Sequence, residues 1–337
     1  MKQIQLWAWT LVALFCSAGP GGAEQTNRAS LDYKKSAGPC AVDILRYDWV
    51  DPKRDRKVPV KIYFPKTGDG PFPVVVFSHG LGGSREGYEY LGRDWASHGY
   101  VSVHVQHLGS DNAVWENTAP DKIMGKMRSS AANLQNAINR PKDVTFVIDQ
   151  LEKLNREERP LKQRLDLDHL GVAGYSFGAF TTLAIAGQTF PGAAQTSLAD
   201  PRVKAVIAMS SPVPSAKARL DEAFRSIKIP CLHMTGTKDY SPIGETKPED
   251  RRLPFDHING PDQFLIIFKD GDHMIFSGGG RMSGGQKDEL FQAYIRMSSI
   301  AFWDAYLKKD AKAKAWLAGG DFKKTLDQDG TFEMKLH

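Results

Sequence analysis

The chain has 337 residues, of which 41% are hydrophobic and 25% are charged, and its formal net charge is +5. These proportions are typical of a globular protein that can bury a sizeable core. The charge is mild for this length and no block of Lys and Arg stands out, so a nucleic-acid partner is not expected. Length alone allows one large domain or two small ones.

The first residues have the pattern of a secretion signal, residues 1–23. Lys2 supplies a positive charge, residues 4–16 are mainly apolar, and small residues follow, with Gly21 and Ala23 suitably placed for cleavage. The apolar run is too short to cross a bilayer comfortably, so no stable membrane span is expected. We therefore expect a secreted or periplasmic protein that is cleaved near Ala23.

Cleavage would leave two cysteines, Cys40 and Cys231. In an oxidising compartment they could form one disulfide, or they could be two separate buried thiols, and the sequence leaves both open. The chain has no Cys-x-x-Cys, His-Glu-x-x-His or EF-hand pattern, so neither a metal nor a cofactor is expected. No pattern indicates the oligomeric state.

Two early strands are expected at residues 41–50 and 57–64, where alternating apolar residues are typical of an antiparallel edge pair. Apolar strands then alternate with helices along the chain, which favours an α/β fold with a mostly parallel sheet. The later strands are expected at 73–77, 100–105, 168–172, 203–209, 229–234 and 263–268, and the helices at 86–98, 128–158, 215–227 and 283–307.

The resulting prediction is an eight-stranded sheet flanked by helices, forming one catalytic domain at residues 41–320. Residues 24–40 are polar and expected to be loosely ordered, and residues 321–337 are expected to form a C-terminal tail. Pro141 is expected to divide the helical stretch 128–158 into two helices, because proline removes a backbone donor inside a helix.

One pentapeptide carries the chemistry, Gly174-Tyr175-Ser176-Phe177-Gly178. It lies between an apolar strand and an apolar helix, the context in which Gly-x-Ser-x-Gly forms a sharp turn that exposes the serine oxygen above a sheet. Glycines suit the two ends because the turn leaves little room for side chains. An ordinary serine in a Gly-rich turn is the alternative, and the rest of the chain argues against it.

A serine hydroxyl needs a base, and the base needs an orienting acid. In α/β-hydrolases the chain order is Ser, then acid, then His. Asp239 follows the expected strand 229–234, and His273 follows the expected strand 263–268, so these two residues are the predicted acid and base for Ser176. Asp256 is the alternative acid and His257 the alternative base.

Two backbone N–H groups are expected to bind the oxyanion. One belongs to Phe177, directly after the serine, and the other to Leu81, in the Gly-rich loop after strand 73–77. Losing one such donor typically raises the reaction barrier by about 2.7–4 kcal/mol. His79, in the same loop, is expected to be a structural hydrogen-bonding residue.

Four segments carry a family resemblance: residues 74–83, 95–100 and 140–144, together with the pentapeptide. They resemble the platelet-activating-factor acetylhydrolase and dienelactone-hydrolase-like branch of the α/β-hydrolases, over roughly residues 58–303. The resemblance implies an α/β-hydrolase fold with Ser176 as nucleophile, His273 as base, and Leu81 and Phe177 as oxyanion donors.

The chain departs from those relatives at the acid. In plasma-type acetylhydrolases the acid follows the strand after the elbow helix, where this chain has Met209-Ser210-Ser211-Pro212 without a carboxylate. The acid is therefore expected at Asp239, as in dienelactone hydrolases and polyester-degrading, cutinase-like esterases. Dienelactone hydrolases use a Cys nucleophile where this chain has Ser176.

The function predicted from the sequence is an exported serine hydrolase that cleaves short-acyl or lipid-like carboxylic esters through a Ser-Asp-His triad. A polyester or lactone hydrolase and an amidase or peptidase are alternatives that share this chemistry. A non-catalytic binding protein on the same fold is an alternative of another class. The expected partner is a small-molecule or lipid-like ester, with residues 107–126 and 240–260 forming the rim of its pocket.

Overall fold

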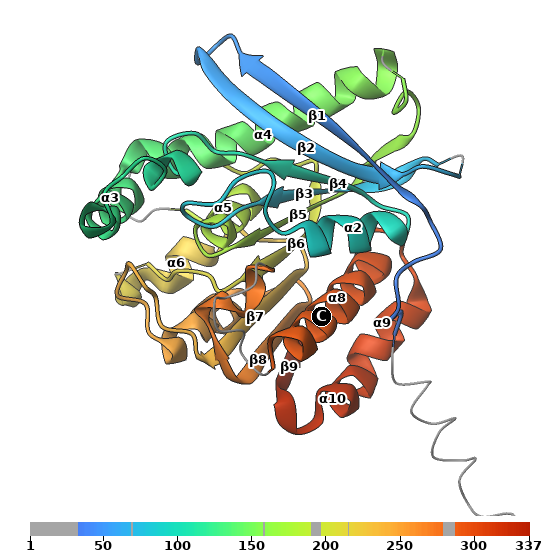
Figure 1. Cartoon of the computed structure of the whole chain (residues 1–337). Coiled ribbons are helices and arrows are strands. Elements are labelled where there is room, and N and C mark those ends of the chain that lie inside the picture. The colour runs from blue at the N-terminus through green and yellow to red at the C-terminus, as the bar shows by residue number, and fades with distance from the viewer. Residues whose placement is uncertain (1–32, 69, 158, 190–196, 215, 279–286) are drawn as a thin grey trace, which may run out of the picture.

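The computed structural model describes residues 33–68, 70–157, 159–189, 197–214, 216–278 and 287–337 (Figure 1). The predicted signal segment, residues 1–23, lies outside the described residues. So does most of the N-terminal segment that was expected to be loosely ordered, residues 24–32.

One mixed sheet runs through the described part of the chain, with strand order β1-β2-β4-β3-β5-β6-β7-β8-β9 (Figure 1). The six strands from β4 to β8 in this order are parallel, whereas β1, β2 and β9 join the edges as antiparallel strands. The strands are β1 Val42–Asp51, β2 Arg56–Pro65, β3 Phe72–Ser78, β4 Val101–Val105, β5 Leu165–Tyr175, β6 Val203–Met209, β7 Cys231–Lys238, β8 Gln263–Asp272 and β9 Gly330–Lys335.

The prediction of eight strands is corrected by β9. The residues expected to form a C-terminal tail instead carry a short helix, α10 (Asp321–Leu326), and the strand β9, which pairs with β8. Phe332 of β9 is buried and stacks on Phe264 of β8. A six-residue half-buried strand gives only a weak alternation in the sequence, and its position depends on the exposed edge of β8.

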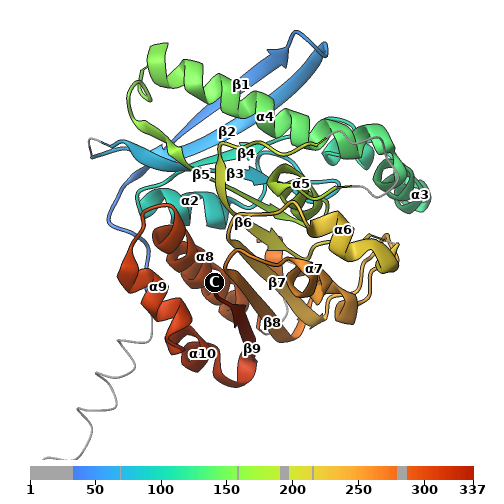
Figure 2. The same cartoon turned by 180° about the vertical axis from the view of Figure 1, so that it is seen from behind.

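Helices cover both faces of the sheet (Figures 1 and 2). On one face α2 and α8 pack together against a core that contains Trp95, Phe302 and Trp303. On the other face α4, α5 and α6 cover a core rich in Val and Leu. The longer helices are α2 Glu89–Ser97, α3 Pro120–Ala132, α4 Leu134–Glu157, α5 Phe177–Ala186, α8 Asp288–Tyr306 and α9 Ala311–Ala318, and α6 spans Leu220–Phe224.

The prediction that Pro141 divides a helix is wrong, because α4 continues through it. The break lies at Asn133, whose backbone is extended and whose side-chain oxygen accepts the N–H of Gln135 at 2.8 Å. An asparagine in this position satisfies a free donor at the start of a helix. Tertiary packing maintains α4 across the proline, since Arg140 and Val144 on either side of it are fully buried.

The carboxyl ends of the parallel strands meet at one edge of the sheet, which is the usual place for ligand sites in open α/β folds. The pentapeptide spans the end of β5 and the start of α5, and the segments after β7 and β8 carry the predicted acid and base. Cys40 and Cys231 are both free thiols in the structure. None of the helices described is long and apolar enough to cross a membrane.

Candidate active site

Ser176 occupies a strained turn between β5 and α5. Its backbone has φ +54° and ψ −116°, a conformation that residues other than glycine rarely adopt and that is found where function requires it. The turn is crowded: a Cβ at Gly174 would lie 2.2 Å from the carbonyl oxygen of Gly178, and a Cβ at Gly178 would lie 1.9 Å from that of Ser78. Both glycines are therefore needed for the turn to approach its neighbours.

The structure brings the three predicted side chains together. His273 begins a short 3₁₀ helix after β8 (His273–Phe276), and its Nε2 lies 3.1 Å from Ser176 Oγ. Its Nδ1 lies 2.7 Å from Oδ1 of Asp239, which follows β7. An ionised carboxylate can only accept hydrogen bonds, so Nδ1 carries the proton and Nε2 is left to accept the Ser176 hydroxyl proton.

Asp239 is fully buried and is held ionised by its neighbours. The hydroxyl groups of Ser210 and Thr235 each donate to its carboxylate at 2.9 Å, and Arg251 Nε lies 3.2 Å from Oδ1. Burial acts to raise the pKa of Asp239, but the hydrogen bond with His273 and the charge of Arg251 outweigh it. The pKa of this carboxyl therefore lies below its usual value.

Two hydrogen bonds fix the backbone of the segment that carries His273. The hydroxyl of Tyr175, the residue before the serine, donates to the His273 carbonyl at 2.7 Å, and the two rings lie 5.0 Å apart. The Asp272 carboxylate accepts the Met274 N–H at 2.8 Å and caps the short helix. The elbow itself therefore helps to orient the predicted base.

Leu81 and Phe177 line the same cavity as Ser176. Within the described residues, neither backbone N–H donates to a protein acceptor, which leaves both able to bind an oxyanion. The loop that carries Leu81 is fixed on both sides: the Gly82 N–H donates to Ser110 O at 2.9 Å, and the Trp115 indole N–H donates to Gly82 O at 2.7 Å.

The cavity beside Ser176 has a volume of about 530 Å³, a size suited to a small organic ligand. Its walls come from the loop after β3, from α3, α4 and α5, and from the segments after β7 and β8. The lining is largely apolar, and among the described residues it includes no Asp, Glu, Lys or Arg. Its apolar members include Leu81, Met127, Ala131, Ala137, Phe177, Phe180, Pro212, Pro242, Ile243 and Met274.

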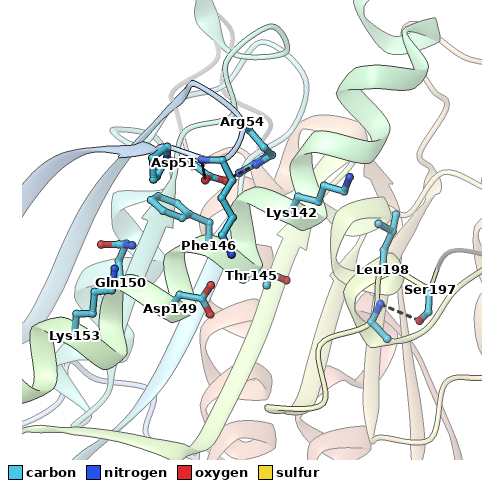
Figure 3. A pocket seen from close by; sticks show the side chains of 13 residues that line it. Asp51, Arg54, Lys142, Thr145, Phe146, Asp149, Gln150, Lys153, Ser197 and Leu198 are labelled. Atoms are coloured by element: carbon cyan, nitrogen blue, oxygen red, sulfur yellow. Dashed lines mark hydrogen bonds and ion pairs between the residues drawn. The ribbon is translucent and has the colours of Figure 1, made fainter.

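A second cavity, also of about 530 Å³, lies between the β1–β2 turn, α4 and residues 197–199 (Figure 3). It shares no lining residue with the first cavity, and its described lining contains neither His nor Cys. Asp51 and Arg54 at its edge pair with each other at 2.5 Å. It is separate from the site around Ser176.

The alternative acid and base lie elsewhere. Asp256 and His257 are both on the short helix α7 (Leu253–His257), and neither lines the cavity. Asp256 is paired with Arg252 at 2.9 Å, and His257 Nδ1 lies 2.6 Å from the Asp221 carboxylate. Of the candidates weighed from the sequence, Asp239 and His273 are the pair that lies beside Ser176.

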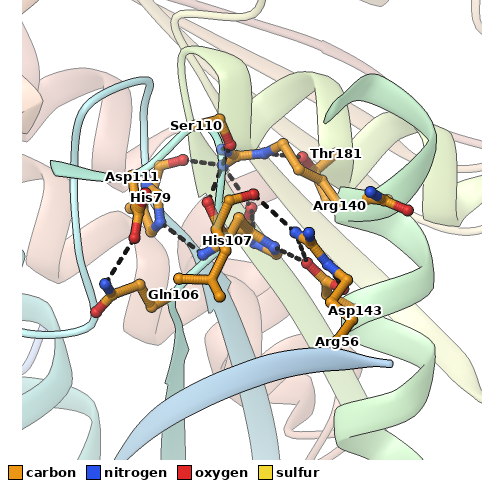
Figure 4. A network of polar contacts seen from close by, with 12 residues as sticks. Arg56, His79, Gln106, His107, Ser110, Asp111, Arg140, Asp143 and Thr181 are labelled. Atoms are coloured by element: carbon orange, nitrogen blue, oxygen red, sulfur yellow. Dashed lines mark hydrogen bonds and ion pairs between the residues drawn. The ribbon is translucent and has the colours of Figure 1, made fainter. Parts of the chain in front are cut away.

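Another Ser-His-Asp set consists of Ser78, His107 and Asp143, of which Figure 4 labels His107 and Asp143. His107 Nε2 is 2.9 Å from Ser78 Oγ, and its Nδ1 is 3.0 Å from the Asp143 carboxylate. All three side chains are completely buried and none lines either cavity, so this set has no access to a substrate. Burial lowers the pKa of His107 to about 4, which keeps its ring neutral.

His79 joins this set to the loop as a structural residue, as predicted. Its Nε2 accepts the His107 backbone N–H at 3.1 Å, so its proton lies on Nδ1, which donates to the Gly80 carbonyl at 2.6 Å. Burial and the nearby Arg140 charge hold the pKa of His79 well below its usual value. A neutral His79 with one fixed tautomer stabilises the turn before Leu81.

Sequence reasoning missed Ser210 and Arg251, which support Asp239. Ser210 Oγ also lies 2.8 Å from His273 Nδ1, and Arg251 donates to the Ser210 and Ser211 carbonyls at 2.8 and 3.0 Å. The serine pair directly after β6 could have indicated Ser210. Because β6 and β7 are neighbouring parallel strands, residues that follow β6 lie close to Asp239, which follows β7. Arg251 lies in a polar stretch of the chain, where nothing in the sequence distinguishes it from a solvated arginine.

Two family models match overlapping parts of the chain. Residues 55–126 match the model described as platelet-activating factor acetylhydrolase, isoform II. Residues 114–248, which contain the pentapeptide and Asp239, match the model described as serine hydrolase (FSH1). These matches confirm the resemblance to serine esterases of the α/β-hydrolase type that the sequence motifs indicate.

Curated relatives are similar over part of the chain, and three of them are named platelet-activating factor acetylhydrolase. Those of Cavia porcellus, Canis lupus familiaris and Bos taurus are 30%, 29% and 27% identical over 155, 148 and 148 residues. The matched regions cover 38%, 35% and 35% of this chain, and 34%, 32% and 32% of the relatives. The chain thus matches about a third of the length of each relative.

Proposed function

We propose that this chain, an α/β-hydrolase of the serine esterase branch, cleaves carboxylic esters through an acyl-enzyme on Ser176. The observation that carries the proposal is the continuous hydrogen-bond chain from Ser176 through His273 to the buried Asp239. Ser176, at the end of these hydrogen bonds, lines an apolar cavity. The same cavity is lined by Leu81 and Phe177, whose backbone N–H groups have no acceptor among the described residues. Nucleophile, base and orienting acid within hydrogen-bond reach are the pattern of activated-serine catalysis.

In the proposed mechanism His273 Nε2 takes the proton of Ser176 Oγ as that oxygen attacks the ester carbonyl carbon. The carbonyl oxygen becomes an oxyanion, which accepts hydrogen bonds from the N–H groups of Leu81 and Phe177. His273 then gives its proton to the leaving alcohol, and the C–O bond breaks. Water, deprotonated by His273, attacks the carbonyl carbon of the acyl-enzyme and again forms an oxyanion. The bond between that carbon and Ser176 Oγ then breaks, His273 returns the proton to Oγ, and the acid is released. Asp239 keeps the His273 ring in one tautomer throughout.

The lining of the cavity favours an ester whose bound portion is uncharged. Because the described lining contains no charged residue, a buried carboxylate or phosphate on the substrate would have no partner there, which is costly. Short-acyl and lipid-like esters satisfy this condition, as do lactones and segments of a neutral polyester. The N-terminal pattern of residues 1–23 adds the proposal that the enzyme is exported before it acts.

An ester panel tests the proposal. Purified protein is assayed with p-nitrophenyl esters from acetyl to long acyl chains, with lactones and with a neutral polyester. Ser176→Ala should abolish turnover of every substrate that the wild type cleaves. Ser277→Ala is the matched control, since Ser277 lines the same cavity but its hydroxyl donates to the Met274 carbonyl, away from the reacting atoms. Turnover by Ser176→Ala at the wild-type rate would contradict the proposal.

A non-catalytic binding protein on this fold is the contrasting hypothesis. It predicts that the cavity binds an ester without turnover and that Ser176 does not react with a fluorophosphonate. The strained conformation of Ser176 favours the catalytic hypothesis, because a binding cavity gains nothing from a strained serine. Stoichiometric labelling of the wild type would exclude the binding hypothesis.

A further inference from the structure

Arg140 is a completely buried cation with unusual contacts (Figure 4). Among the described residues, none of its partners is a carboxylate within ion-pair distance. Its nearest acidic neighbour along α4, Asp143, is instead paired with Arg54 and Arg56 at 2.8 Å each. Burial lowers the pKa of Arg140 to about 9. A buried charge satisfied by neutral oxygens is costly, so its contacts call for an explanation.

Those contacts reach both halves of the oxyanion site. One amino group of Arg140 donates to Ser78 Oγ at 3.1 Å and also to the carbonyl of His79. That carbonyl belongs to the peptide before Gly80-Leu81, so Arg140 holds the backbone that leads directly to the first donor. The other amino group donates to Ser110 Oγ at 2.8 Å, and the Ser110 carbonyl accepts the Gly82 N–H.

The second donor is held from the same guanidinium. Arg140 Nε donates to Thr181 Oγ1 at 3.0 Å, and the Thr181 hydroxyl in turn donates to the Phe177 carbonyl at 3.0 Å. The guanidinium carbon also lies 4.6 Å from the centre of the Phe177 ring. Arg140 is therefore in contact with the segments on both sides of the oxyanion site, at the end of β3 and in the first turn of α5.

We propose that Arg140 is a positioning residue that sets the separation of the Leu81 and Phe177 N–H groups and places a positive charge behind the oxyanion. The inference rests on the proposed ester hydrolysis. A planar group with five donors suits this role, since a lysine ammonium cannot contact four acceptors in fixed directions. Preorganised donors and charges of this kind act on the transition state more than on the bound substrate.

Arg140→Lys tests the inference, with Arg56→Lys as the matched control. Arg56 belongs to the same buried network, but its contacts are Asp143 and the Leu108 carbonyl, away from the oxyanion site. We expect Arg140→Lys to lower kcat for p-nitrophenyl acetate by about 100-fold, which is the lower end of the loss seen when one oxyanion donor is removed. KM should stay within about threefold of the wild-type value. Arg56→Lys should retain a kcat close to that of the wild type.

Comparing the affinity for a trifluoromethyl ketone with that for a ligand that forms no oxyanion separates loss of oxyanion stabilisation from general loss of structure. The ketone forms a tetrahedral oxyanion on the serine, so its inhibition constant should rise in Arg140→Lys by the same factor as kcat/KM falls. Affinity for an uncharged ether analogue of the ester, which forms no oxyanion, should change little. If Arg140→Lys is folded and either keeps a kcat close to that of the wild type or binds the ketone as the wild type does, the inference is wrong.

Thr181→Val and Ser110→Ala keep the inference falsifiable if Arg140→Lys does not fold. Each removes one acceptor of Arg140 and leaves the guanidinium in place. Each should lower kcat by about tenfold without a matching change in KM, the effect of one hydrogen bond on the barrier. Wild-type kcat in both would overturn the inference. If the wild type cleaves no ester, the proposed function itself is wrong. If the wild type cleaves esters and these variants have the same kcat, only the proposed role of Arg140 is wrong.

Discussion

Replacing Asp239 by Asn separates what this residue does for stability from what it does for catalysis. The side chain keeps its size but loses its charge, next to a guanidinium that is itself buried: Arg251 and Asp239 have exposures of 1% and 0%, and their Nε and Oδ1 atoms lie 3.2 Å apart. At an effective dielectric constant of about 20, a charge pair at that separation is worth about 5 kcal/mol. Removing one partner of a buried pair costs about 3–5 kcal/mol.

We therefore expect Asp239→Asn to lower the free energy of unfolding by about 3–5 kcal/mol, measured by urea unfolding. The same substitution should lower kcat by about 10⁴-fold, because an amide can donate to His273 Nδ1 and so favours the wrong tautomer. Arg251→Met should also destabilise the fold, since it leaves the Asp239 charge buried and unpaired.

The double variant Asp239→Asn/Arg251→Met distinguishes the two roles. With both charges removed, no unpaired charge remains, so the double variant should be more stable than the sum of the single effects predicts. Its kcat should stay as low as that of Asp239→Asn, because no carboxylate orients His273. Additive effects on the free energy of unfolding would contradict the claim that the two buried charges stabilise each other. Recovery of activity in the double variant would contradict the claim that Asp239 orients His273.

Further predictions concern the tight turn and the buried histidines. Gly178→Ala should destabilise the fold by at least about 1–3 kcal/mol in urea unfolding, because its Cβ would lie 1.9 Å from the Ser78 carbonyl oxygen. As the control, Gly125→Ala on α3, where nothing lies within 4 Å, should instead stabilise the fold by about 0.5–1 kcal/mol. Equal changes in the free energy of unfolding for the two variants would contradict the crowding at Gly178. Burial lowers the pKa of His104 to about 3 and of His107 to about 4, so the unfolded chain binds protons below about pH 6.5 that the folded chain does not. The free energy of unfolding should therefore fall by about 1.4 kcal/mol per pH unit for each of these residues as the pH drops from about 6.5 toward 4; His104→Phe should reduce that slope by one such contribution, and an unchanged slope would contradict it.

The parts of the fold with a local signal could be predicted from the sequence. The apolar run that ends at Ser78 and the Gly-x-Ser-x-Gly motif each specify a buried strand followed by a turn, because the pattern and the conformation are set by adjacent residues. Asp239 and His273 could be found because parallel strands bring their carboxyl ends to one edge, so position along the chain translates into position in space.

The remaining features depend on contacts between segments that are distant in the sequence. Arg251 reaches Asp239 from a polar stretch, and Arg140 reaches the oxyanion loop from α4, and neither contact leaves a periodic pattern in the sequence. Pro141 shows the opposite case, in which packing overrides a strong local signal. The strand β9 forms because β8 offers an unpaired edge, which is a property of the assembled sheet.

Covalent labelling tests most directly whether Ser176 is the nucleophile. Wild-type protein and Ser176→Ala are treated with a fluorophosphonate, and the modified peptide is identified by mass spectrometry. We predict one label per wild-type chain, on the peptide that contains Ser176, and none on the variant. A label on another residue, or equal labelling of Ser176→Ala, would contradict the assignment.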